Sequence, residues 1–409
     1  MKKQNFAKIA IITPGYKPVP DVAGGAVEHL ITQIILENEK DPHYYFELYT
    51  VPHEELNKFN LRYTHINLVQ NWRKNYFKRR ISFLFNHFFA KIHSNWRMNF
   101  MVNEICRKLP NDISAIIMEN DMDILRALKP KCKKNPIIFH MHNDFDTFAE
   151  MQKTKEAMAW VVKNVSEIWA VSHYVKNHIL SVFPDSNAKV LQNCIDKDRF
   201  SAIVSEPEKQ AFRELYGISD DDFVILYSGR IIKQKGILEL INAVSILPEN
   251  IPYKLLIVGD ISSAPKEYVR ELKNASKNIT NKIIFTGYIP QYQIQTAYAV
   301  ADIVAVPSQC QEAFCLTALE ASCHCKVCVA SDSGGLAEVL DTTCAKMIPL
   351  GDNYIQNFCK AILELYQDST LRLKMEKNAV KKARTFSDAK QYFSDFCKLI
   401  DDFSIAKGV

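Results

Sequence analysis

The sequence predicts an α/β protein made of two doubly wound parallel sheets. Short apolar runs alternate with helix-length amphipathic segments along the chain, which is typical of βα units. This alternation stops in a polar, acidic passage at residues 201–210 and then starts again. The chain has 409 residues, of which 47% are hydrophobic, so it is long enough for two or three domains.

The apolar runs and their spacing give the expected elements. In the first half we expect strands at residues 8–12, 45–51, 115–118, 136–139, 168–172 and 189–191. In the second half we expect them at residues 223–227, 253–259, 282–285, 302–306 and 327–330. Apolar residues at helical spacing predict a closing helix at 386–403. We therefore expect an N-terminal domain at 1–205, a second domain at 206–385 and a C-terminal helix at 386–409.

Composition excludes several classes of protein. A net charge of +5 does not call for nucleic acid as a partner, and no run of 18 apolar residues predicts a membrane span. The apolar start at residues 6–12 is interrupted by Lys8 and closed by Pro14-Gly15, so it predicts a buried strand rather than a signal peptide. The 11 cysteines are irregularly spaced, which favours free thiols in a cytoplasmic protein.

One segment departs from the alternating pattern. Residues 56–103 contain no Asp or Glu, whereas cations gather at Arg73, Lys74, Lys78, Arg79, Arg80, Lys91 and Arg97. An apolar stripe at helical spacing runs through Ile81, Leu84, Phe85, Phe88, Phe89 and Ile92. Two interpretations stay open for residues 72–97: an interfacial helix at an anionic membrane surface, or a core-facing helix with a solvated basic end.

The loop after the expected strand 223–227 has the residues that a diphosphate site needs. Ser228-Gly229-Arg230 is followed by Lys235-Gly236 and a helix. Free amides at a helix start, a guanidinium fork and an ammonium together suit two negative phosphates. The alternative is a surface turn with two solvated cations. The Gly-rich turn Gly24-Gly25 is a second candidate, but it lacks the spacing of a dinucleotide-binding loop or the lysine of a phosphate loop.

Two carboxylates flank a later strand-to-helix turn. Glu312 is expected in the loop after strand 302–306, and Glu320 about one turn into the next helix. The amides of Phe314, Cys315 and Leu316 would point out of that helix start towards hydroxyl or phosphate oxygens. One carboxylate can hold a ribose and the other a sugar. The alternative is a helix-start acid followed by an exposed helical Glu.

Histidine and cysteine clusters raise the question of a metal. His140 and His142 share one face at the end of an expected strand, where they could also cap it by local hydrogen bonds. The cysteines of segment 323–328 cross a helix end into a strand, so we expect buried, inert thiols rather than zinc. Asp121-Met122-Asp123 is expected to be a polar turn or a helix cap. We expect no metal and no cofactor.

Taken together, these segments resemble family 4 glycosyltransferases over nearly the whole chain. The residues from Glu312 to Gly335 resemble the family's E-x7-E region, and Ser228-Gly229-Arg230 with Lys235-Gly236 resembles its diphosphate motif. The first-loop glycines, the segment Ala170-Val171-Ser172 and the segment 193–196 occur in the family's order. The resemblance implies the GT-B fold, which has two Rossmann-like domains facing a cleft.

The resemblance also implies roles for individual residues. According to this resemblance, Arg230 and Lys235 bind the diphosphate, and Glu320 binds the ribose. Glu312 would bind the donor sugar, and His142 would lie near the transferred sugar. The family usually has glycine where this chain has Cys194, Cys315 and Cys325. A side chain at Cys315 would reshape the donor pocket.

The expected function is transfer of a sugar from a nucleotide diphosphate sugar to an acceptor hydroxyl, with retention of configuration. By the resemblance, the N-terminal domain binds the acceptor, and the C-terminal domain binds the donor. The acceptor would be a saccharide or a lipid-linked glycan at the inner face of the membrane if the basic helix is interfacial. A sugar-nucleotide epimerase, a phosphorylase on the same fold and a non-catalytic partner subunit remain as alternatives.

Overall fold

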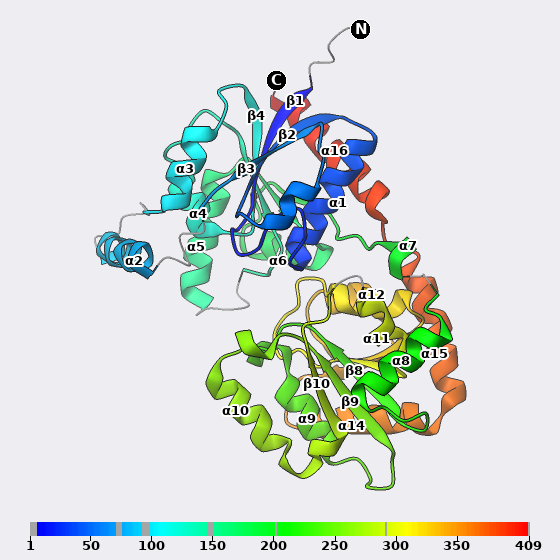
Figure 1. The fold of residues 1–409 in the computed structure, drawn as a ribbon. Coiled ribbons are helices and arrows are strands. Elements are labelled where there is room, and N and C mark those ends of the chain that lie inside the picture. The colour runs from blue at the N-terminus through cyan, green and yellow to red at the C-terminus, as the bar shows by residue number, and fades with distance from the viewer. Residues whose placement is uncertain are drawn as a thin grey trace. The chain divides into compact units, whose positions relative to one another are not determined.

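The structure is a computed structural model that describes residues 6–70, 76–91, 98–145, 151–200, 203–290 and 293–407. The chain divides into two compact units, Met1–Cys194 with Ala389–Val409, and Ile195–Asp388. The division therefore falls between residues 194 and 195, and the last helix belongs to the first unit. Figure 1 shows the two units, each with its own sheet.

The described residues of the first unit form a seven-stranded parallel sheet in the order β3-β2-β1-β4-β5-β6-β7. The strands are β1 Ala7–Ile12, β2 Tyr44–Thr50, β3 Thr64–Leu68, β4 Ile113–Glu119, β5 Ile137–Met141, β6 Glu167–Ala170 and β7 Ala188–Val190. The helices are α1 Ala26–Lys40, α2 Tyr76–Lys91, α3 Phe100–Lys108, α4 Met122–Leu128, α5 Met151–Asn164, α6 His173–Val182 and α16 Ala389–Lys407, with a 3-10 turn η1 at Glu54–Lys58. Helix α16 packs beside α1 although the two lie at opposite ends of the sequence.

The described residues of the second unit form a six-stranded parallel sheet in the order β10-β9-β8-β11-β12-β13. The strands are β8 Phe223–Ser228, β9 Tyr253–Val258, β10 Ile283–Gly287, β11 Ile303–Val306, β12 Val327–Asp332 and β13 Ala345–Pro349. The helices are α7 Lys197–Phe200, α8 Glu206–Tyr216, α9 Ile237–Ser245, α10 Lys266–Ala275, α11 Ile294–Val300, α12 Leu316–Cys323, α13 Leu336–Val339, α14 Tyr354–Gln367 and α15 Ser369–Ala383. Three 3-10 turns complete it: η3 Lys233–Lys235, η4 Ile261–Ser263 and η5 Lys277–Lys282.

Both sheets confirm the predicted fold class and share one topological feature. In each, the first strand of the unit lies in the interior, and the chain builds outward first on one side and then on the other. The reversal falls between β1 and β4 in the first sheet and between β8 and β11 in the second. In open parallel sheets of this kind, ligands bind beyond the carboxyl ends of the strands at such a reversal.

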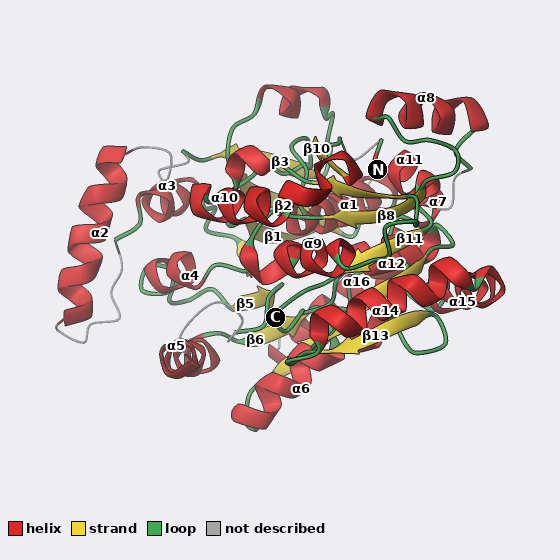
Figure 2. Ribbon diagram, turned by 90° about the horizontal axis from the view of Figure 1, so that it is seen from below, coloured by secondary structure: helices red, strands yellow, loops and turns green. Residues whose placement is uncertain are grey.

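Helix α2 is not packed as an amphipathic helix with its apolar stripe in a core would be. Two of its polar residues face the rest of the unit: Ser82 Oγ donates to Met98 O at 2.7 Å, and Met98 N donates to Asn86 Oδ1 at 2.7 Å. Phe77, Phe83, Leu84, Phe85 and Phe88 are exposed, by 47% to 73%. Figures 1 and 2 both show α2 standing outside the body of the unit. The cations Arg73, Lys74 and Arg97 lie outside the described residues.

None of the helices in the described part of the chain combines the length and the apolar content that a membrane span requires.

Aromatic packing attaches the last helix, α16, to the first sheet. Phe396 of α16 packs edge-on against Trp169 of β6, with ring centroids 5.6 Å apart, and lies 6.0 Å from Phe46 of β2.

Candidate active site

In the second unit, two loops meet at the reversal of the sheet. The loop after β8 carries Arg230 and Lys235, and the loop after β11 carries Glu312. Gly236 has a φ of 68°, and a Cβ there would lie 1.8 Å from Pro307 O. Gln309 N also donates to Gln234 O at 2.8 Å. Only glycine at position 236 allows this close approach, which brings Lys235 to the second loop.

Lys235 and Glu312 form the central contact of the site. Lys235 Nζ lies 2.6 Å from Glu312 Oε1, and Ser308 Oγ donates to the same oxygen. Burial alone would lower the pKa of Lys235, but the Glu312 carboxylate outweighs it and raises that pKa above its ordinary value. Glu312 is only 8% exposed. The site therefore holds a charged pair whose two members can each take a different part of a ligand.

The Glu312 loop is supported from behind by a third loop. Gly335 N donates to Glu312 O at 2.6 Å. Gly334 has a φ of 56°, and a Cβ there would lie 2.4 Å from the same carbonyl oxygen. The Ser333-Gly334-Gly335 segment therefore fixes the backbone that carries the carboxylate.

Glu320 is held by a tyrosine from a neighbouring helix. Tyr298 Oη of α11 donates to Glu320 Oε2 at 2.7 Å. Thr317 Oγ1, in the same helix as Glu320, donates to Ser228 O at 3.2 Å. This second bond ties the start of α12 to the end of β8, so Glu320 belongs to the same strand-end region as the diphosphate loop.

The start of α12 lies where the sequence predicted it. The helix begins at Leu316, and Cys315 precedes it with a φ of 82°. Burial raises the pKa of the Cys315 thiol to about 12, with a further contribution from Glu312. Phe314 is buried and packs edge-on against Phe386 at 5.7 Å. Its side chain therefore belongs to the core.

Arg230 is exposed at the end of the β8 loop. Tyr227 Oη donates to Arg230 O at 2.7 Å, which fixes the backbone of this residue while its side chain reaches solvent. The structure thus places one half-buried cation, Lys235, and one exposed cation, Arg230, in the same short loop. Diphosphate binding by this pair remains a prediction.

In the first unit, the predicted glycines precede a buried carboxyl group. Gly24 and Gly25 have φ values of 68° and 125° and lead into α1. A Cβ at Gly25 would lie 2.2 Å from Glu28 Oε2. Burial raises the pKa of Glu28 to about 7, and the cation Lys17 opposes this shift.

His142 is joined to a residue that the sequence analysis did not single out. Glu119 Oε2 lies 2.8 Å from His142 Nε2 and 3.0 Å from His140 Nδ1. Burial alone would raise the pKa of Glu119, but the two imidazoles outweigh it and lower that pKa to about 2. Burial, with His140 as a second cause, lowers the pKa of His142 to about 4. The sequence did contain a signal for Glu119: a glutamate at the end of an apolar strand that precedes the strand leading to His140 and His142.

Among the described residues, Glu119, His140 and His142 could also hold a metal ion, because their possible ligand atoms lie within 4.8 Å of one another. The cysteines of segment 323–328 only partly match the expectation, because Cys328 is buried whereas Cys325 is exposed. Asp121 accepts a bond from Ile124 N at 2.8 Å and caps α4, as predicted.

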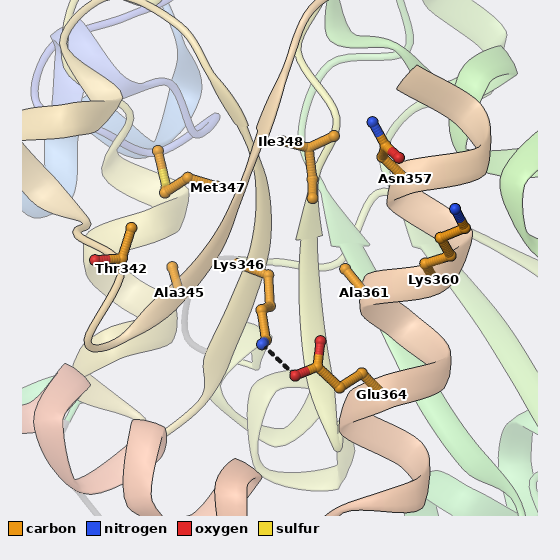
Figure 3. Close-up of a pocket in the computed structure, with 9 residues that line it drawn as sticks. All are labelled: Thr342, Ala345, Lys346, Met347, Ile348, Asn357, Lys360, Ala361 and Glu364. Atoms are coloured by element: carbon orange, nitrogen blue, oxygen red, sulfur yellow. Dashed lines mark hydrogen bonds and ion pairs between the residues drawn. The ribbon is translucent and has the colours of Figure 1, made fainter. Parts of the chain in front are cut away.

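A separate hollow lies away from these loops. Its volume is about 360 Å³. Figure 3 shows most of its lining residues on β13 and α14. Lys346 Nζ crosses it to Glu364 Oε1 at 2.6 Å. None of its lining residues belongs to the site described above.

Comparison with known proteins finds a family that the second unit resembles. Residues 208–382 match the family described as glycosyl transferases group 1. They fall within Ile195–Asp388, so the match lies wholly in the second unit.

Two curated relatives extend the match. The chain is 31% identical to lipopolysaccharide 1,2-N-acetylglucosaminetransferase of Salmonella typhimurium over 236 residues, 56% of this chain and 57% of that protein. It is 27% identical to the putative glycosyltransferase YtcC of Bacillus subtilis over 270 residues, 64% of this chain and 65% of that protein. The chain therefore matches less than two thirds of the length of either relative.

Solved structures resemble the chain over almost its full length. HepE of Anabaena, in complex with UDP and glucose, has a TM-score of 0.76 at 18% identity and covers 97% of this chain and 100% of its own. WaaG, a glycosyltransferase involved in lipopolysaccharide biosynthesis, has a TM-score of 0.67 at 14% identity and covers 96% and 99%. At these identities the likeness assigns the fold, which is the predicted GT-B fold.

Proposed function

We propose that this protein is a glycosyltransferase that moves a sugar from a nucleotide diphosphate sugar to an acceptor hydroxyl. The observation that carries the proposal is the ion pair of half-buried Lys235 and buried Glu312, 2.6 Å apart, where the loops after β8 and β11 meet. It lies in the part of the chain that matches the glycosyl transferases group 1 family. Neighbouring strand ends at a sheet reversal are where such a fold binds nucleotides.

A sugar nucleotide can separate this pair without leaving either charge unsatisfied. Its diphosphate would take the ammonium of Lys235 together with the Arg230 guanidinium, and sugar hydroxyls would donate to Glu312. Glu320, already oriented by Tyr298, would accept from the ribose hydroxyls. The ion pair thus keeps the buried Glu312 carboxylate and the half-buried Lys235 ammonium neutralised until the donor arrives.

We further propose that transfer retains the anomeric configuration, as the resemblance to family 4 glycosyltransferases implies. The acceptor would attack from the face of the leaving diphosphate, and the leaving phosphate oxygen would take the acceptor proton. His142 would bind a sugar hydroxyl near this centre, and no metal or cofactor is expected. The similarity to lipopolysaccharide 1,2-N-acetylglucosaminetransferase and to WaaG, which is involved in lipopolysaccharide biosynthesis, supports a saccharide or lipid-linked glycan as acceptor.

Binding of nucleoside diphosphates tests the donor site. A thermal-shift panel with uridine, guanosine, adenosine and thymidine diphosphates should identify one base, with a gain of about 2.7 kcal/mol at 100 times the dissociation constant. The double variant Lys235→Met/Glu312→Gln should lose this gain. Lys233→Ala is the matched control, because Lys233 is an exposed cation of the same loop. Equal binding by the two variants would contradict the assignment.

Product analysis separates the proposal from its alternatives. An epimerase would convert the nucleotide sugar without an acceptor, and a phosphorylase would require free phosphate. A non-catalytic partner subunit would give no product and no stabilisation by any nucleoside diphosphate. Transfer to a saccharide acceptor, with the anomeric configuration read by NMR, would support both the transfer and its stereochemistry.

We propose a second contact for the same enzyme, between α2 and an anionic membrane surface on the cytoplasmic side. Four phenylalanines and a leucine of α2 are exposed, which disfavours the core-facing interpretation. A helix with exposed Phe and Leu in a segment that has cations and no carboxylates suits the interface of an anionic bilayer. This position would bring the enzyme to lipid-linked acceptors.

Vesicle co-sedimentation tests this contact. Wild-type protein should sediment with vesicles that contain phosphatidylglycerol, and less with pure phosphatidylcholine. Phe83→Ser/Phe88→Ser should abolish sedimentation, and so should neutralising Lys78, Arg79 and Arg80 with Gln. Leu373→Ser on α15 is the control, since Leu373 is 55% exposed outside this helix. Unchanged sedimentation of the α2 variants would contradict the membrane contact.

A further inference from the structure

The end of β4 carries a buried carboxylate that contacts two imidazoles. Glu119 is 2% exposed, and its Oε2 faces His140 Nδ1 at 3.0 Å and His142 Nε2 at 2.8 Å. The rings of the two histidines lie with centroids 4.1 Å apart. One oxygen therefore meets one nitrogen of each ring.

Strand register explains how the three side chains meet. Glu119 of β4 pairs directly with His140 of β5 in the parallel sheet. His142 lies two residues further on and therefore on the same face as His140. Both strands end here, next to the reversal between β1 and β4, and His142 N also donates to Asn120 Oδ1 at 3.0 Å.

The contacts fix where the ring hydrogens lie. An ionised carboxylate has no proton and can only accept hydrogen bonds. Both ring nitrogens that face Glu119 must therefore carry hydrogens, which are Nδ1–H of His140 and Nε2–H of His142. A neutral His142 then has its lone pair on Nδ1, and this nitrogen can only accept a hydrogen bond.

We infer that Glu119 is a positioning residue that holds His142 in its Nε2–H form, so that His142 Nδ1 accepts a hydrogen bond from a hydroxyl of the sugar substrate. This inference rests on the proposed transferase function. It selects one of the two roles open to His142: orienting a hydroxyl, rather than donating a proton to the leaving phosphate. An imidazole fixed in this form aligns the hydroxyl without changing its own charge.

Kinetics of Glu119→Gln tests the role. A glutamine keeps the size of the side chain but can donate as well as accept, so it no longer fixes the form of His142. We expect kcat to fall at least tenfold, the KM for the donor to change less than threefold, and nucleoside diphosphate binding to stay at the wild-type level. Loss of that binding would instead contradict the proposed donor site. Failure of the positioning role and failure of the proposed function can therefore be distinguished.

Glu167→Gln is the matched control. Glu167 is 3% exposed in the same sheet and pairs with Lys189 at 2.8 Å, but it lies at the opposite end of its strand. A merely structural role of Glu119 predicts similar losses for both variants. We expect Glu167→Gln to lower the melting temperature while leaving kcat within twofold of wild type.

Spectroscopy gives a readout independent of turnover. In protein labelled with 15N-histidine, wild-type His142 should show a protonated Nε2 and an unprotonated Nδ1 at neutral pH, and Glu119→Gln should mix the two forms. A protonated Nδ1 in the wild type would overturn the inference. Stoichiometric metal in the purified protein, removed together with activity by a chelator, would also overturn it, because the three atoms would then be metal ligands.

Discussion

Two cysteines of the second unit occupy backbone conformations that glycine adopts at lower cost. Cys315 has a φ of 82° and Cys325 a φ of 57°, both in the left-handed region. Cys194, the third position where the resemblance implies glycine, is not among the described residues with a positive φ. A residue with a Cβ is destabilised there by about 1 kcal/mol, so two of the three substitutions carry strain.

Replacing Cys325 with glycine should therefore stabilise the second unit. Cys325 is exposed, so the change removes little packing. We expect Cys325→Gly to raise the free energy of unfolding by up to about 1 kcal/mol, measured by urea denaturation. Cys325→Ala removes the thiol but keeps the Cβ and should give no gain. An equal gain in both variants would show that the thiol, and not the backbone, is the cause.

Glu28 makes the stability of the first unit depend on pH. Burial raises its pKa from an ordinary 4.5 to about 7. The folded state thus holds a proton that the unfolded chain releases between these values, and stability falls as pH rises through this window. Glu28→Gln removes the ionisation and should be more stable than wild type at pH 8 by about 3 kcal/mol, but not at pH 4.5.

Urea unfolding at the two pH values checks this sign. A gain that is equal at pH 4.5 and pH 8 would mean that the variant changes packing and not ionisation. Tryptophan fluorescence is the appropriate signal, because the described Trp160 and Trp169 lie in the same unit as Glu28.

At the scale of elements, most strands could be predicted from the sequence because each is a short apolar run. The strands β3 and β13 were missed, and both are edge strands. Thr64–Leu68 and Ala345–Pro349 mix polar and apolar residues and are only partly buried, since one side of an edge strand is less covered. The sequence of such a short strand cannot be distinguished from that of a loop.

Helix α2 shows a second limit of the pattern. Its apolar stripe was recognised, but periodicity reports only that one face is apolar and not what covers it. The structure shows which face of α2 contacts the rest of the unit, because Ser82 and Asn86 form hydrogen bonds with Met98. In the same way, Lys235 and Glu312 were both predicted as site residues, whereas the Glu119 contact needed the β4–β5 register.

Helix α16 should be essential for the first unit although it follows the second unit in sequence. Phe396 lies against Trp169 and Phe46, and Tyr44 Oη donates to Asp401 Oδ1 at 2.9 Å. Phe396→Ala should destabilise the first unit by about 3–5 kcal/mol, seen as a lower midpoint of the tryptophan transition. Leu373→Ala, in the exposed face of α15, should leave that midpoint unchanged. An unchanged midpoint for Phe396→Ala would mean that α16 does not stabilise the sheet.

At the scale of the whole molecule, the chain forms two units, each with its own sheet and core. The proposed nucleotide contacts Arg230, Lys235, Glu312 and Glu320 all belong to the second unit. All four tryptophans of the sequence, Trp72, Trp96, Trp160 and Trp169, precede residue 195. Tryptophan fluorescence therefore follows the unfolding of the first unit, whereas calorimetry follows both.

This separation allows a test of which unit holds the nucleotide. We expect two thermal transitions, and the best nucleoside diphosphate of the panel should raise the one without a tryptophan signal, by an amount equivalent to about 2.7 kcal/mol at 100 times its dissociation constant. The tryptophan transition should not move, because the base, ribose and diphosphate contacts are proposed in the second unit. Adding the same nucleotide to Lys235→Met/Glu312→Gln should leave both transitions in place. A shift of the tryptophan transition alone would place the nucleotide on the first unit and contradict the donor site.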